Sequence, residues 1–200
     1  MTIETPSIVK RTGEEAFTCQ GQMLDVTLKD FWSWAYSDIL NNATRGVLAE
    51  FIVMHLLGIE RAYRLEWDAF DIETQHGLKL EIKSSAYVQS WKQHTHSRIT
   101  FGIQPTQGWN ATTNAYAMSS TRQSDVYIFC VLTEKDPHRI DPLQLEQWDF
   151  YLVETSVLNE VLGAQKTLGL QRLFALHPIH TDYRHLKEEI DKLERKYNLL

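Results

Sequence analysis

Apolar and polar residues alternate with a period of two on both sides of a short turn at residues 75–77. Every second position is apolar in residues 78–83, and the same holds for residues 70–73 before the turn. This alternation is typical of β-strands with one buried face. A three-residue loop that ends in glycine, here Gly77, is a common hairpin connection. The pattern therefore predicts an antiparallel β-hairpin over residues 70–83.

The loop also predicts the register of this hairpin. With Thr74 opposite Leu78, the apolar residues of the two strands pair with one another. A slip by one residue would turn acids toward the core, so the apolar pattern supports the same register independently. In this register Asp71 lies opposite Glu81, whereas Asp68 lies on the other face.

Opposing acids on a hairpin suggest metal chemistry. Two neighbouring carboxylates repel each other and are stable as anions when a hard divalent cation lies between them, so Mg²⁺ or Mn²⁺ is the expected cofactor. Lys83 follows Glu81 by two residues and points the same way along the strand, where it could hold a phosphate or orient a water. An ordinary solvated strand face is the alternative explanation.

A second pattern is the apolar run at residues 46–57, which only Glu50 and His55 interrupt over three helical turns. A helix that is apolar all round is usually buried, so we expect the Glu50 carboxylate at a packed face. A buried acid needs a partner or a metal. A salt bridge to Arg45 or Arg61 is the structural alternative.

The rest of the pattern predicts a single α/β domain with a mixed sheet. Strands are expected at residues 62–67, 99–103, 126–132 and 148–153, and helices at 27–36, 86–93, 156–162, 168–176 and 183–197, the last packed on the domain. Residues 105–124 are expected to form a long loop that contacts substrate. Residues 1–24 are expected to be a loosely held arm, 43–133 the core, and 134–200 a C-terminal elaboration with an extra strand and helices.

Charge is distributed unevenly along the 200 residues. The net charge is −6, yet none of the 26 acids lies between Ile82 and Ser124, where an even spread would place about five. Donors suited to phosphate contacts occupy this stretch: Ser84, Ser85, Gln89, Lys92, His94, His96, Arg98 and Arg122. A polar loop is the alternative. Net acidity argues against a general nucleic-acid coating protein, while an enzyme with one local positive groove remains compatible.

Composition places few other constraints on function. The two cysteines are far apart, and Cys130 lies in an apolar strand, so neither a disulfide nor a cysteine-based zinc site is expected. Histidine pairs at 94/96 and 177/180 lack an evident third ligand, which disfavours zinc there. The polar N-terminus is no secretory signal, and no apolar run is long enough to span a bilayer. A cytoplasmic location is expected.

Taken together, Glu50 on a helix, then Asp71, then Glu81-Ile82-Lys83-Ser84-Ser85 resembles the PD-(D/E)XK nuclease superfamily, which has the restriction-endonuclease-like fold. The resemblance covers roughly residues 43–133 and implies a core of helix, three-strand meander, helix and strand. It implies the following roles: Asp71 and Glu81 as metal ligands, Lys83 as the catalytic lysine, and Glu50 as the helix acid. Gln89 matches a glutamine that some members carry on the next helix. Phe70 replaces the proline of the family's Pro-Asp dipeptide.

The expected function is a metal-dependent endonuclease that hydrolyses phosphodiester bonds in DNA, in a restriction or repair setting. DNA is the expected partner, without a membrane or a nucleotide cofactor. A homodimer is also expected, since double-strand cutting by so small a chain would normally need two copies. The alternatives are a non-catalytic nucleic-acid-binding or assembly module on the same fold, and a domain that binds a phosphate ligand.

Overall fold

The computed structural model describes residues 7–61, 63–64, 69–110 and 115–199, with the side chains of 108–110 and 115–118 left aside. The chain divides into two compact units, which are described one at a time. The first comprises residues 1–38 and 61–64, and the second comprises 39–60 and 65–200. The expected organisation, one domain with an N-terminal arm and a C-terminal elaboration, stays a prediction.

The first unit contains strands β1 (Ala16–Cys19) and β2 (Gln22–Thr27), followed by helix α1 (Leu28–Tyr36). The helix was predicted, and Thr27 and Asp30 cap it through a reciprocal pair of side-chain to backbone bonds. The β1–β2 hairpin falls largely within residues 1–24, which were expected to form a loosely held arm. Gln20 and Gly21 both have positive φ, as the tight turns of two-residue hairpins require.

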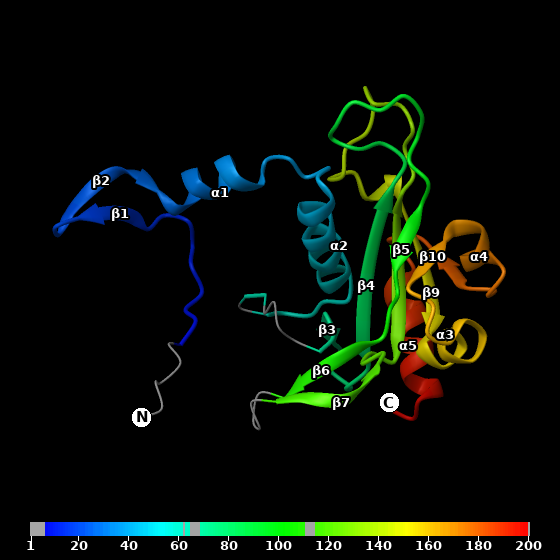
Figure 1. Cartoon of the computed structure of the whole chain (residues 1–200). Helices are drawn as coiled ribbons and strands as arrows, with labels where there is room; N and C mark the ends of the chain where they lie inside the picture. Colours follow the sequence, from blue (N-terminus) through cyan, green and yellow to red (C-terminus); the bar gives the residue numbers. More distant parts are fainter. Residues whose placement is uncertain (1–6, 62, 65–68, 111–114, 200) are drawn as a thin grey trace. The chain divides into compact units, whose positions relative to one another are not determined.

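The second unit is built on a five-stranded mixed sheet, which confirms the predicted α/β fold class (Figure 1). Its strands are β3 (Ile72–Glu73), β4 (Lys79–Ala86), β8 (Val126–Leu132), β9 (Trp148–Glu154) and β11 (Ile179–Thr181), in the order β11-β9-β8-β4-β3. Strands β4 and β8 are parallel, and the other neighbours are antiparallel. Strand β8 is buried along its whole length, as its uninterrupted apolar sequence predicted.

Helices cover both faces of this sheet. On one face α2 (Asn42–Leu56) and α5 (Leu186–Lys196) contribute Ala49, Ile52, Val53, Leu186, Ile190 and Leu193 to the core. On the other face α3 (Thr155–Leu162) and α4 (Leu170–Phe174) contribute Leu158, Leu162 and Leu173, which pack with the aromatic residues of β8 and β9. The period-two alternation of β9 divides its side chains between the two cores. The prediction that the C-terminal helix packs on the domain is confirmed.

Short strands complete the second unit and correct two expectations. Strand β5 (Thr100–Gly102) pairs with β10 (Thr167–Gly169), so the expected helix over 168–176 is reduced to α4. Strands β6 (Thr106–Asn110) and β7 (Ala115–Thr121) pair as a hairpin where a long loop was expected. A single-turn 3₁₀ helix, η1 (Leu145–Gln147), precedes β9.

Two further expectations have different outcomes. The strand expected at 62–67 falls mostly outside the described residues, as does Asp68. Cys130 is buried, as expected, and both cysteines are free. Within the described part of the chain, no helix is long and apolar enough to cross a membrane.

Candidate active site

The β3–β4 hairpin has the predicted register. Ile72 pairs with Leu80, and Thr74 N donates to Leu78 O at 2.9 Å. Gly77 has a φ of +89°, the left-handed conformation that the end of a three-residue loop requires. The local pattern of apolar residues and one glycine was therefore sufficient to predict how this hairpin pairs.

The Asp71 carboxyl lies at the start of this hairpin and is half-buried. Its Oδ2 accepts a hydrogen bond of 2.7 Å from Ile82 N, which holds it against β4. Burial, followed by repulsion from Glu81 and Glu50, raises the pKa of Asp71 to about 7, while the Ile82 bond and the charge of Lys83 oppose the rise. The charges of Glu50, Glu81 and Lys83 therefore all lie close enough to act on the Asp71 carboxyl.

Glu81 and Lys83 lie on the same face of β4. Lys83 Nζ is 2.5 Å from Glu81 Oε1, and the two side chains are 32% and 19% exposed, in the order lysine, glutamate. This partial exposure differs from a freely solvated strand face and still leaves both groups accessible. The Lys83 ammonium can donate to the Glu81 carboxylate, as it does here, or to a phosphate oxygen.

Tyr127 is a neighbour of this site that sequence reasoning missed. It is buried on β8, directly across from Glu81 in the parallel β4–β8 pairing. Burial, with the nearby Glu81 charge, raises the pKa of Tyr127 to about 12. The two strands are more than 40 residues apart, so no local pattern indicates this contact.

Helix α2 places Glu50 at this site, but the helix is not buried all round. Asn41 caps its first turn by accepting from Ala43 N at 3.0 Å. Val47 and Phe51 are 43% and 57% exposed, which corrects the expectation of a fully buried helix. The apolar run includes more residues than the packed face of the helix can bury. The half-buried Glu50 lies between the packed face and the exposed face.

One proposed alternative for Glu50 was an ion pair with Arg45. Arg45 is only 2% exposed, and its guanidinium donates to Leu40 O at 2.8 Å, Asn42 Oδ1 at 2.7 Å and Gln89 Oε1 at 3.2 Å. These three acceptors are all uncharged, and burial lowers the pKa of Arg45 to about 10. Arg45 therefore connects the start of α2 to the segment that follows β4.

Gln89 is the other end of that connection, and it does not lie on a helix. Its Nε2 donates to Ala86 O at 2.8 Å. The expected helix over 86–93 is absent, since Ala86 ends β4 and the residues after it form bends and irregular structure. The Gln93 side chain accounts for the difference, because it accepts from Gln89 N at 2.7 Å and donates to Tyr87 O at 3.2 Å. A side chain thus takes up backbone groups that a helix would pair.

Some of the residues predicted to contact nucleic acid are accessible to solvent, and others are buried. Lys92, His94, His96 and Arg98 are exposed, and Ser84 is half-buried. Ser85 is buried and accepts from Thr100 N at 3.4 Å, so it links β4 to β5. His96 also lies 3.0 Å from Lys135 O through its Nε2.

Arg122 is 8% exposed and belongs to the packing of the second unit. Its guanidinium donates to one side-chain oxygen, Asn159 Oδ1 at 2.6 Å. It also donates to three backbone carbonyls, which are Ile103 O at 2.9 Å, Gly163 O at 2.9 Å and Gln165 O at 3.3 Å. A buried guanidinium with these partners is not offered to a phosphate, so we leave Arg122 out of the proposed nucleic-acid-binding residues.

The acids fit a metal that takes few protein ligands. Among the described residues no group of three His, Cys, Asp or Glu side chains is placed to hold an ion. His180, which belongs to one of the two histidine pairs considered for zinc, pairs with Asp149 at 3.1 Å. Mg²⁺ is usually bound by one or two carboxylates, with water and phosphate oxygens completing its shell. The opposed pair of Asp71 and Glu81 matches that donor set, and the charge of Glu50 also acts on Asp71.

An α/β core with opposed acids and a lysine on one hairpin is the arrangement expected of a nuclease. A family model described as bacteriophage T4 endonuclease IV matches residues 26–172. The chain belongs to this endonuclease family, because the match spans more than half of its length. Membership confirms the predicted nuclease class and supports a DNA endonuclease, without distinguishing the PD-(D/E)XK superfamily. No curated protein matches the chain.

Proposed function

We propose that this protein is a Mg²⁺-dependent endonuclease of the PD-(D/E)XK type that cuts DNA. The observation that carries the proposal is the opposition of Asp71 and Glu81 on the β3–β4 hairpin, with Lys83 beside them. Family membership supports the nuclease activity. A restriction or repair role, a homodimer and a cytoplasmic location belong to the same proposal.

The Asp71 and Glu81 carboxylates would hold the metal, whose charge would offset the burial and the repulsion that together raise the pKa of Asp71. When bound, Mg²⁺ would polarise the scissile phosphate and activate a water. Lys83 can donate to a phosphate oxygen in place of Glu81 and so stabilise charge that develops in the transition state. Glu50 adds negative charge and can orient a water near the metal.

The exposed cations of the segment after β4 would bind the DNA backbone. Lys92, His94, His96 and Arg98 come from a stretch without acids, so their attraction for phosphate is not offset locally. Phosphate contacts of this kind position a substrate without specifying its sequence. Ser84 is half-buried and lies on the opposite face of β4 from Lys83, so it would contact the substrate separately from the lysine.

Supercoiled plasmid nicking tests the proposal. Cleavage should require Mg²⁺ or Mn²⁺, stop in EDTA, and fall more than about 100-fold in Glu81→Gln and Lys83→Ala. Glu160→Gln and Lys166→Ala are matched controls on exposed residues and should cut normally. Normal cutting by Glu81→Gln or Lys83→Ala would refute the assignment. If the parent protein retards DNA in a gel but does not cut it, the non-catalytic alternative is favoured.

A further inference from the structure

Glu194 is a buried acid far from the predicted site in sequence. It is only 3% exposed, although it lies on α5 among exposed charged residues. Burying a carboxyl group without compensation is unfavourable, so such a residue usually has a specific partner. Helix α5 also begins beyond the part of the chain that the family model matches. The partner of Glu194 therefore indicates what this helix adds.

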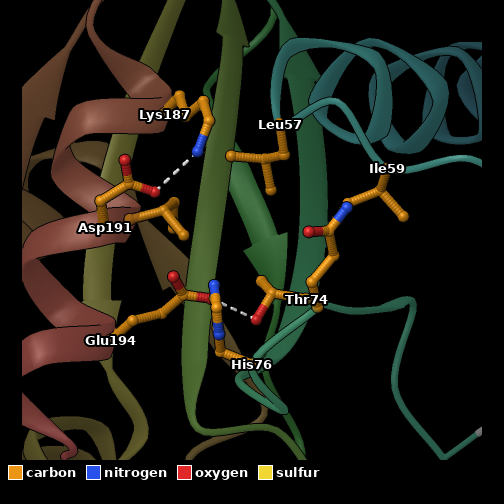
Figure 2. Close-up of a pocket in the computed structure, with 9 residues that line it drawn as sticks. Leu57, Ile59, Thr74, His76, Lys187, Asp191 and Glu194 are labelled. Atoms are coloured by element: carbon orange, nitrogen blue, oxygen red, sulfur yellow. Dashed lines mark hydrogen bonds and ion pairs between the residues drawn. The ribbon is translucent and has the colours of Figure 1, made fainter. Parts of the chain in front are cut away.

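That partner is Thr74, in the turn of the β3–β4 hairpin. The Thr74 hydroxyl donates to Glu194 Oε1 (Figure 2). It also accepts from Leu78 N at 3.1 Å. The Thr74 backbone closes the same loop, because its carbonyl accepts from Gly77 N at 3.0 Å. One side chain of α5 thus holds the residue around which the hairpin turns.

The surroundings make this contact well suited to a fixed anchor. It lies beside a cavity of about 40 Å³ whose lining includes apolar Leu57, Ile59 and Ile190 and charged Lys187 and Asp191. This space admits a few water molecules. Glu194 itself is buried, and hydrogen bonds are stronger electrostatically in buried surroundings than in water.

The hairpin needs an anchor because of where it lies. Strand β3 has only two residues and forms the edge of the sheet, with β4 as its single neighbour among the described strands. Asp71 immediately precedes it, opposite Glu81, so the position of this carboxylate depends on how the short edge strand is held. The anchored turn holds that strand from three residues away.

We propose that Glu194 is a positioning residue that acts through the Thr74 hydroxyl to keep Asp71 opposite Glu81 in the arrangement that binds the metal. This inference rests on the proposed function. It assigns α5 a part in catalysis that does not involve contact with substrate. Supporting residues of metal ligands typically change metal affinity by about 10–100-fold when they are removed.

The test measures Mg²⁺ binding to the full chain by titration calorimetry, together with plasmid cleavage as a function of Mg²⁺ concentration. Thr74→Val and Glu194→Leu remove the hydrogen bond and should raise the half-maximal Mg²⁺ concentration about tenfold or more. Thr74→Ser and Glu194→Gln keep a donor and an acceptor, respectively, and should stay within about threefold of the parent. The double variant Thr74→Val/Glu194→Leu should equal the stronger single variant, because both act on one bond.

Lys196→Met is the control for general loosening of α5. It breaks the exposed Lys196–Glu154 ion pair of 2.6 Å on the same helix, and its Mg²⁺ dependence should not change even if its melting temperature falls. If Glu81→Gln is inactive while Thr74→Val and Glu194→Leu have the parent's Mg²⁺ dependence, only the positioning role is overturned. If Glu81→Gln cuts normally, the proposed function and this inference both fail.

Discussion

Replacing Asp71 by asparagine should stabilise the metal-free protein at high pH while it abolishes cleavage. The pKa of Asp71 is raised from 3.8 to about 7, a shift of roughly three pH units, which corresponds to at most about 4 kcal/mol. Because the carboxyl is half-buried and water screens part of the repulsion, we expect about 1–3 kcal/mol to be measured.

The direction of the pH effect on stability follows from the protonation state of Asp71 that the folded protein prefers. An acid whose pKa is raised on folding stabilises the fold below its unfolded pKa, and this contribution is lost as pH rises from about 4 through about 7. The parent protein should therefore lose 1–3 kcal/mol between pH 5 and pH 8 relative to Asp71→Asn. Asparagine keeps an oxygen that can accept from Ile82 N, so the bond of 2.7 Å need not be lost.

Urea unfolding in EDTA at pH 5 and pH 8 measures this difference, with Glu160→Gln as the exposed control. Added Mg²⁺ at pH 8 should then stabilise the parent by about 2.7 kcal/mol at one hundred times its dissociation constant, and stabilise Asp71→Asn much less. An Asp71→Asn protein that is less stable than the parent at pH 8, or equally sensitive to Mg²⁺, would refute the reasoning.

Three further predictions concern residues around the site. Gln89→Leu leaves the buried Arg45 guanidinium without one acceptor and should cost about 1–3 kcal/mol in urea unfolding; an unchanged midpoint would contradict the contact. Arg122→Met should lower the unfolding midpoint sharply and leave the salt dependence of DNA binding as it is, whereas a stable protein with a smaller salt slope would return Arg122 to the binding surface. In an inactive Glu81→Gln background, Lys92→Ala and Arg98→Ala should each reduce the salt slope of DNA binding by about one; unchanged slopes would remove these cations from the interface.

Features encoded in neighbouring residues were predictable from the sequence. The hairpin register follows from alternation plus Gly77, and the α1 cap follows from Thr27 and Asp30. Strand β8 is apolar at every position and could only be central. These elements bury one or both faces, so their patterns are strong.

The misses have equally specific causes. Strands β1 and β2 bury almost nothing, so they lack a clear alternation. Arg122 looked like a free cation because its acceptors lie 19 to 43 residues away. Glu194 looked like part of a solvated face, and its partner Thr74 is 120 residues distant. In each case the decisive contact is long-range, where spacing in the sequence carries no information.

Helix α5 has a consequence for anyone who wishes to produce this nuclease in shortened form. The family match ends at residue 172, and that limit is a natural place to cut the gene. A protein ending there would lack Leu186, Ile190 and Leu193, and would uncover the part of the central sheet that α5 covers beside α2. Such a product should aggregate on expression, since uncovered apolar sheet surface associates readily. The shared part of the family is thus smaller than the part that has to fold together.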